Sequence, residues 1–214
     1  MNKDTHLLSL DKRPFYDFEV KPANRLVELA ADLISSRQNI SPKRLVEPGP
    51  NSEQTEQMFN AAAAAPDHGL LTPWRFVLIP EHRRVDLAEV FALALIDRDP
   101  SATLEQIEDA RAKAYRAPFL ALAVAKLGSC EPNIPKLERM VSLGAAIQNI
   151  LLSAHSHGFG SGLTSGQAMQ SARMRKLFEL AEGDEAVCFV NVGTVSKRKT
   201  SRLRPSSVTF VSIL

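Results

Sequence analysis

The sequence is poor in cysteine and in net charge, and each of these shortages removes a class of protein from consideration. It holds two cysteines in 214 residues, 6% aromatic residues, and 26 Lys and Arg against 24 Asp and Glu. Cys130 and Cys188 have no metal-ligand neighbours in the sequence, so we expect no metal site, and a reducing, cytoplasmic compartment fits them. A net charge of +2 gives no general attraction for nucleic acid or for an anionic membrane.

Long apolar runs are missing as well. The N-terminal stretch MNKDTHLLSLDKRPFYDFEV has no apolar core long enough for a signal peptide, and no segment approaches the roughly 20 apolar residues of a membrane span. The chain is 44% apolar and 23% charged, which is the range of globular proteins. We therefore expect a soluble, cytoplasmic protein with one domain over residues 25–214 and an N-terminal extension over residues 1–24.

Residues 61–79, AAAAAPDHGLLTPWRFVLI, form the most informative stretch. Ala is the best helix former and Pro cannot continue a helix, so the alanine run predicts a helix that ends at Pro66. The continuous apolar run at residues 76–79 predicts a strand buried on both faces. The stretch therefore indicates a helix, a loop and a strand in succession.

The loop within that stretch carries an acid, an imidazole and the only Trp of the chain, at Asp67, His68 and Trp74. A loop with such groups between two buried elements is a common place for function. The alternative is that Asp67 caps the turn, His68 bonds a nearby carbonyl and Trp74 belongs to the core, because polar groups in loops usually serve the backbone first. The local pattern favours neither interpretation.

Arg37, Gln38 and Asn39 directly follow the first predicted helix. We expect the apolar residues of that helix to face the core: Leu26, Leu29, Ala30, Leu33 and Ile34. An Arg at the end of a helix is also an ordinary partner for the helix dipole. His155 and His157 lie at the end of a later helix. They are most simply interpreted in the same way, as cations at a helix C-terminus.

Residues 158–166, GFGSGLTSG, form a glycine-rich segment that we expect to be a loop. Its glycine spacing is wrong for a dinucleotide-binding fingerprint, and it follows a helix where that motif needs a strand. What it offers is exposed backbone N–H groups that a planar ligand can approach closely.

The rest of the chain alternates helical and strand patterns. Asn51 and Gln54 have capping-box spacing at the start of a helix, and Ser101 is expected to cap a charged, solvated helix through Tyr115. Further helices are expected at residues 83–96, 136–157 and 172–180, and strands at residues 74–79, 118–125 and 186–195. The helix at 136–157 is apolar around most of its circumference, which predicts burial against a second subunit.

The chain becomes basic after the last of these strands, at Lys197, Arg198, Lys199, Arg202 and Arg204. Such a run is usually a solvated loop, and a weak nucleic-acid patch is the next interpretation. The lack of interleaved aromatic residues disfavours the nucleic-acid interpretation. The final residues, SSVTFVSIL, have the composition of a strand.

Four segments, in this order, resemble the nitroreductase family of flavoproteins, and most closely its small single-domain branch. They are SRQN at 36–39, the most telling motif APDHxxxxPWxF at 65–76, GFGSG at 158–162 and VGT at 192–194. The resemblance covers residues 25–214. It implies an α+β fold with a central mixed β-sheet of four to five strands flanked by helices, and an intertwined homodimer with C-terminal strand exchange and two FMN at its interface.

The resemblance also implies which residues hold FMN. The family usually has Arg-Arg-Ser at the position of residues 37–39, where it holds the phosphate and ribityl chain. The implied cofactor-binding residues are Arg37, Gln38, Asn39, His68, Leu163, Thr164, Ser165, Arg202 and Arg204, with His68 acting from the opposite subunit. At Gln38, Ala64 and Thr164 the chain lacks cations that relatives often have, which lowers the FMN affinity we expect.

The function implied is that of an FMN-dependent oxidoreductase that uses NAD(P)H to reduce nitroaromatic, quinone or similar acceptors by a ping-pong mechanism. The flavin N5 carries the hydride in such chemistry, so no catalytic side chain is required. The implied partners are a second copy of the chain and a small-molecule electron acceptor, with no nucleic acid or membrane, and residues 104–115 are a candidate lid. The lost cations also motivate a different hypothesis, a sensor or interaction module that binds flavin weakly or not at all. A third hypothesis is another flavin chemistry on the same fold.

Overall fold

The computed structural model describes residues 23–128, 133–198, 200 and 203–214. The chain divides into two compact units, residues 1–35 and 36–214. Among the described helices, none has both the length and the apolar character needed to cross a membrane. The cytoplasmic location and the domain boundary at residue 25 stay predictions.

The described part of the first unit is a single helix, α1 (Ala23–Ser36). The sequence led us to expect that the apolar residues of this helix face the core. Leu26, Leu29 and Ile34 are each about half exposed, and Leu33 is only partly buried. An amphipathic pattern shows that a helix has an apolar face but does not show what covers that face, so the burial of these residues stays a prediction.

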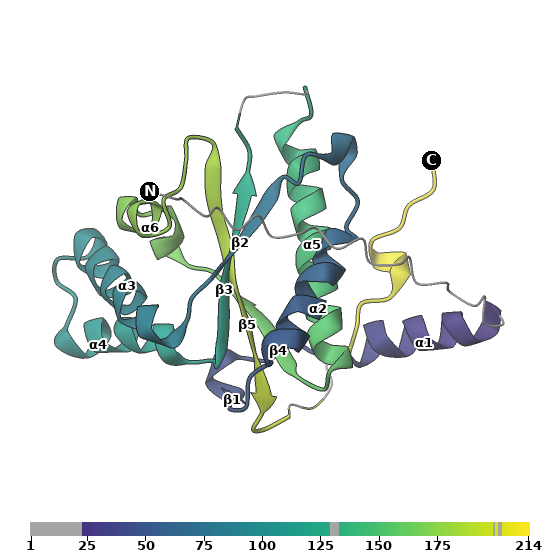
Figure 1. Cartoon of the computed structure of the whole chain (residues 1–214), viewed down its shortest axis with the longest axis horizontal. Helices are drawn as coiled ribbons and strands as arrows, with labels where there is room; N and C mark the ends of the chain where they lie inside the picture. Colours follow the sequence, from purple (N-terminus) through teal and green to yellow (C-terminus); the bar gives the residue numbers. More distant parts are fainter. Residues whose placement is uncertain (1–22, 129–132, 199, 201–202) are drawn as a thin grey trace, which may run out of the picture. The chain divides into compact units, whose positions relative to one another are not determined.

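The second unit is built on a sheet of five strands, with β1 (Leu45–Val46), β5 (Asp184–Val195), β3 (Phe119–Lys126) and β2 (Trp74–Leu78) in that order and β4 (Gly160–Thr164) paired with β5 (Figure 1). This confirms the α+β class and the number of strands. The ladders between these strands are antiparallel, so the expected mixed sheet is corrected in this respect. A parallel pairing remains in the isolated bridge between Asn39 and Ser161.

The helices cover the two faces of the sheet separately. Figure 1 shows α2 (Ser52–Ala63) and α5 (Lys136–Ser156) on one side, and α3 (Arg84–Arg98), α4 (Leu104–Ala112) and α6 (Ala172–Leu177) on the other. The buried apolar residues accordingly form one large cluster on each face, and alternate residues of β3 and β5 enter each cluster. We refer to the two sides as the α5 face and the α3 face.

Strand position explains two departures from the sequence-based expectations. β2 lies at an end of the sheet, so it is only partly buried, and Leu78 is 48% exposed where a strand buried on both faces was expected. Residues 160–164, expected as part of a loop, form strand β4. A Cβ at Gly162 would lie 2.1 Å from the Ile40 carbonyl oxygen, so the glycines allow residues 39–40 to lie close against β4.

The helix starts were predicted with mixed success. Asn51 and Gln54 form the expected capping box of α2. The cap of α4 is Thr103, which forms a capping box with Gln106, and not Ser101. Ser101 instead bonds to the Asp99 carboxylate through its backbone N–H and its hydroxyl.

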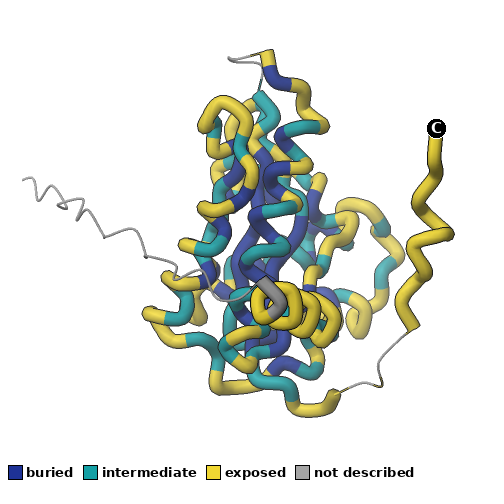
Figure 2. The backbone as a smooth tube through the Cα atoms, turned by 90° about the vertical axis from the view of Figure 1, so that its right-hand side faces the viewer, coloured by how far each residue is buried: buried dark blue, intermediate teal, exposed yellow. Residues whose placement is uncertain are grey.

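The C-terminal residues 203–214 form no strand. They contain one short 3-10 turn, Ser207–Thr209, and are exposed along their whole length (Figure 2). A β-strand needs a neighbouring strand for its hydrogen bonds, and a single chain offers none at this position. Strand exchange with a second subunit therefore stays a prediction.

Candidate functional site

Residues 37–40 lie against the outer edge of β4. The Ile40 N–H donates to the Ser161 carbonyl at 2.9 Å, and the Leu163 N–H donates to the Asn39 side-chain oxygen at 3.3 Å. The tripeptide and the glycine-rich segment, which are far apart in the sequence, are thereby brought together. Asn39 holds the two segments together, which is a structural role in addition to the one the resemblance implied.

A cavity of about 120 Å³ lies where these segments meet, and we call it the cradle. Its walls include Arg37, Gln38, Ser161, His155 and Arg198. The Nε of Arg37 and the Oγ of Ser161 are buried, and neither has a hydrogen-bond partner in the described part of the chain. Buried polar atoms are rarely left without a partner, and a guanidinium N–H and a hydroxyl are the donors that phosphate oxygens accept from. The residues present therefore fit the phosphate of FMN.

The electrostatics of the cradle favour an anion. Burial lowers the pKa of Arg37, and the nearby charge of Arg204 lowers that pKa further. Arg204 is held in place because its Nη2 donates to the Arg37 carbonyl at 2.7 Å. Two guanidinium groups this close repel each other, and an anion between them would relieve that repulsion.

His155 also lies in this basic environment, which lowers its pKa. Burial lowers its pKa first, and the charges of Arg198 and Arg37 lower that pKa further. Its Nε2 lies 2.8 Å from the hydroxyl of Ser36. Neighbouring cations and partial burial therefore disfavour the imidazolium form that the position of His155 at the helix end would favour.

In the loop at 67–74, Asp67 and Trp74 have the structural roles that the sequence allowed, whereas His68 does not. Asp67 accepts from the backbone N–H groups of Leu71 and Thr72 and so stabilises the turn, and Trp74 is a core residue at 7% exposure. His68 is exposed, and its Nδ1 lies 2.6 Å from a carboxylate oxygen of Glu138 on α5. Within one chain, His68 is not among the residues that line the cradle.

The remaining predicted residues lie at the other end of β4 or in the tail. Leu163 is 39% exposed, while Thr164 and Ser165 line a second, larger cavity. Arg204 contacts Arg37, as described above. Arg202 lies outside the described residues.

Sequence reasoning missed three side chains at the cradle, namely Ser161, His155 and Arg198. Ser161 alternates with glycines in what proved to be a strand, and this alternation was the available signal. Arg198 belongs to the basic run, but Arg202 and Arg204 were preferred to it. For His155 the sequence held no signal, because its contact with Ser36 joins residues that are 119 positions apart.

These observations define the class of protein: an α+β protein with a basic cradle, suited to an anion, at the edge of its sheet. The model of the nitroreductase family matches residues 43–194. The chain is 33% identical over 186 residues to "Putative NAD(P)H nitroreductase YdjA" of Escherichia coli K12, an alignment that covers 86% of this chain and 98% of that protein. The chain therefore belongs to the nitroreductase family, which confirms the resemblance and makes it an oxidoreductase.

Solved structures agree on the fold. A nitroreductase-like family protein from Bacillus cereus superposes with a TM-score of 0.74 at 17% identity, covering 86% of this chain and 95% of that chain. An FMN-dependent nitroreductase from Clostridium difficile R20291 gives a TM-score of 0.59 at 15% identity, covering 85% and 96%.

Proposed function

We propose that this chain is an FMN-dependent oxidoreductase that uses NAD(P)H to reduce nitroaromatic, quinone or similar acceptors as a homodimer. The observation that carries the proposal is the cradle, where the buried Arg37 Nε and Ser161 Oγ have no hydrogen-bond partner among the described residues and lie near the cations of Arg198 and Arg204. When bound, FMN supplies the chemistry by accepting a hydride from NAD(P)H and passing reducing equivalents to the acceptor. The two structural neighbours and YdjA carry names consistent with this activity.

The chain's own residues bind and orient the cofactor. Arg37 donates to the phosphate through a planar, charged fork, and the Ser161 hydroxyl donates from the wall of β4. β4 continues from Ser161 to Thr164 at about 3.3 Å per residue, so it leads about 10 Å away from the cradle. We assign Leu163, Thr164 and Ser165, at that end, to the flavin ring, as the resemblance implies.

The cation missing at Gln38 does not by itself favour the hypothesis of a flavin-free sensor. Gln38 lines the cradle, and Arg198 lines it as well, which restores the positive charge that an Arg at position 38 would have supplied. Gln38 also keeps an amide N–H₂ group that can donate to a phosphate oxygen.

The dimer is part of the proposal because surfaces of one chain remain apolar and exposed. Leu137 and Val141 on α5 are 81% and 71% exposed, and a Cβ at Gly144 would meet nothing within 4 Å. These three residues share one face of α5, where they leave room for a helix of a second copy. In such a dimer we assign His68 to the cofactor bound mainly by the opposite subunit.

The proposal is tested by the absorption spectrum of the purified protein, followed by release and identification of the chromophore and by NAD(P)H turnover. We expect FMN at about one per chain. Arg37→Gln should weaken FMN binding by about 10- to 100-fold, because a hydrogen bond to a charged group contributes about 1.5–3 kcal/mol. Arg83→Gln, which removes a surface Arg paired with Asp86, is the matched control and should leave the affinity unchanged.

Ser161→Ala separates a cofactor role from a structural one. The variant should weaken FMN binding, yet it should stabilise the flavin-free protein by about 1 kcal/mol, because it removes a buried hydroxyl for which the described part of the chain supplies no hydrogen-bond partner. A colourless protein that takes up no added FMN would refute the proposal. Loss of stability in flavin-free Ser161→Ala would show that the hydroxyl serves the fold.

A further inference from the structure

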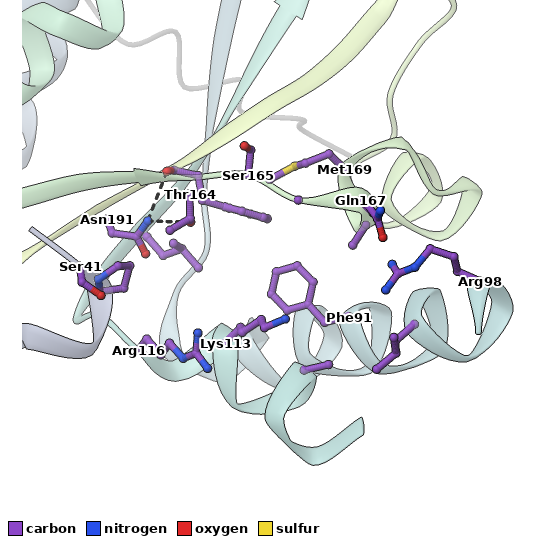
Figure 3. A pocket seen from close by; sticks show the side chains of 17 residues that line it. Ser41, Phe91, Arg98, Lys113, Arg116, Thr164, Ser165, Gln167, Met169 and Asn191 are labelled. Atoms are coloured by element: carbon purple, nitrogen blue, oxygen red, sulfur yellow. Dashed lines mark hydrogen bonds between the residues drawn. The ribbon is translucent and has the colours of Figure 1, made fainter. Parts of the chain in front are cut away.

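The larger cavity, of about 520 Å³, continues the cofactor site on the α3 face of the sheet (Figure 3). The two segments that border the cradle run on into it, because residues 37–40 lead to Ser41 and β4 leads to Ser165, and both of these residues line the larger cavity. Thr164 and Ser165, which we assign to the flavin ring, lie in its wall. On the function proposed above, an electron acceptor must reach that ring, so we call this cavity the acceptor pocket.

The apolar part of the acceptor pocket suits a flat ring. Figure 3 shows the ring of Phe91 in the middle of the pocket, across from the end of β4. Phe91 is held edge-on against Phe189, with ring centroids 5.7 Å apart, and Leu120 and Met169 add further apolar surface. The volume of the pocket is within the range of about 300–1,000 Å³ that is usual for small-molecule sites. An aromatic acceptor can therefore pack against Phe91.

Charge in the acceptor pocket has one sign. Arg98, Lys113 and Arg116 line it, and no Asp or Glu is among its described lining residues. The side chains of Lys113 and Arg116 form no ion pair or hydrogen bond within the described part of the chain. Arg111 on the neighbouring α4, by contrast, is paired with two glutamates. Two cations without a partner beside an apolar surface favour a ligand that is both aromatic and anionic.

The wall that carries these two cations is fixed in place. Arg84, which is 4% exposed, donates to three backbone carbonyls between Ala114 and Pro118 at 2.6 to 3.2 Å. Ala114, next to Lys113, is fully buried in the apolar cluster of the α3 face. The backbone that positions Lys113 and Arg116 therefore needs no rearrangement to bind a ligand, which lowers the entropic cost of recognition.

We propose that the acceptor pocket selects anionic aromatic acceptors, namely nitroaromatic or quinone molecules of one or two rings that bear a carboxylate. The ring lies against Phe91, and Lys113 and Arg116 hold the carboxylate. This inference rests on the proposed function and names the class of acceptor that the same site prefers. With a nitro acceptor, NAD(P)H supplies two electrons and one proton and the solvent supplies a second proton, so that one N–O bond breaks, water leaves and a nitroso product keeps its carboxylate.

The test compares 4-nitrobenzoate with 4-nitrobenzamide, a neutral molecule of nearly the same shape, as acceptors for the purified full-length protein loaded with FMN. A carboxylate withdraws electrons less than an amide does, so a preference for the carboxylate must come from the protein. We expect kcat/KM for 4-nitrobenzoate to exceed that for 4-nitrobenzamide by about tenfold. Arg116→Gln should lower the ratio of the two values about tenfold, and Lys113→Gln, which changes a more exposed cation, about threefold. Arg116→Lys keeps the charge and should retain most of the preference.

The matched control is Lys176→Gln, which removes an exposed cation of α6 on the same side of the sheet and should leave the ratio unchanged. Menadione, a neutral quinone, shows whether the protein is an active oxidoreductase. Calorimetric titration with benzoate and benzamide is a second measurement that needs no turnover, and we expect benzoate to bind about tenfold more tightly. Circular dichroism of each variant establishes that it is folded before it is compared.

The outcomes separate this inference from the function on which it rests. Equal kcat/KM for the two nitro compounds, in a protein that reduces menadione, would refute the inference and leave the proposed function standing. A protein that reduces none of the three acceptors would refute the proposed function, and equal affinity for benzoate and benzamide would refute the inference even in such a protein.

Two further results would also overturn the inference. NAD(P)H is itself an anion, and its kcat/KM is measured separately from that of the acceptor. A fall in kcat/KM for NADPH in Arg116→Gln, with an unchanged ratio for the two acceptors, would show that the cations bind the electron donor. A change in Lys176→Gln as large as in the pocket variants would show a general charge effect.

Discussion

Gly162→Ala is the substitution to which we expect the site to be most sensitive. A Cβ at residue 162 would lie 2.1 Å from the backbone oxygen of Ile40 and 3.1 Å from the side-chain oxygen of Asn39. Because the nearer obstacle is backbone, residues 39–40 must move away from β4. That movement breaks the Ile40 to Ser161 and Leu163 to Asn39 hydrogen bonds. Two hydrogen bonds at about 1 kcal/mol each and overpacking of about 1–3 kcal/mol together predict a loss of about 3–5 kcal/mol.

The assay is urea unfolding followed by circular dichroism, together with FMN titration of the folded protein. The control is Gly166→Ala, because residue 166 has an extended backbone and a Cβ there would meet nothing within 4 Å. We expect Gly166→Ala to keep the stability of the natural chain and Gly162→Ala to lose both stability and FMN affinity. If the two variants unfold at the same urea concentration, residues 39–40 do not lie against β4 and the description of the cradle is wrong.

Three further predictions concern the rest of the second unit. Arg84 is 4% exposed and donates to four backbone carbonyls. Arg84→Gln should therefore destabilise the fold by about 3 kcal/mol in urea unfolding. An unchanged unfolding midpoint would contradict this. Burial raises the pKa of Cys188 to about 11. The thiol should therefore resist iodoacetamide at pH 8 until the protein unfolds. Rapid alkylation of the native protein would contradict this. The pKa of His155 in flavin-free protein should lie below 6.5 by NMR titration and should rise in Arg37→Gln. Because the pKa of His155 is lower in the folded protein than in the unfolded chain, the stability contributed by neutral His155 is present above pH 6.5 and is lost as the pH falls below 6.5. A measured pKa of 6.5 or more would refute this.

Features set by short-range chemistry were predictable from the sequence. The capping box of Asn51 and Gln54, the buried strand β3 and the long helix α5 each depend on residues that are neighbours in the chain. Arg37 and Gln38 were placed in the site by a resemblance, and the structure does line one cavity with both. Local pattern alone had left Arg37 as an ordinary helix-end cation.

Features set by long-range pairing were not predictable in this way. Residues 160–164 have the glycine content of a loop, and they become a strand only because β5 and residues 39–40 lie on either side of them. The exposure of β2 depends on strand order, which a single apolar run does not specify. The acceptor pocket brings together Phe91, Lys113 and Thr164, whose separation along the chain left no common motif to read.

The position of His68 shows why the cofactor site and the dimer should be considered together. Within one chain, His68 is exposed beside Glu138 and is absent from the lining of the cradle, although its motif carries most of the resemblance to the family. On the same helix as Glu138, Leu137 and Val141 present an apolar face to solvent. A second copy seated on that face would bury these two residues and lie directly beside His68, because Leu137 is adjacent to Glu138 in the helix. The apolar face of α5 and the position of His68 therefore both agree with the proposed dimer, in which two chains would complete each cofactor site.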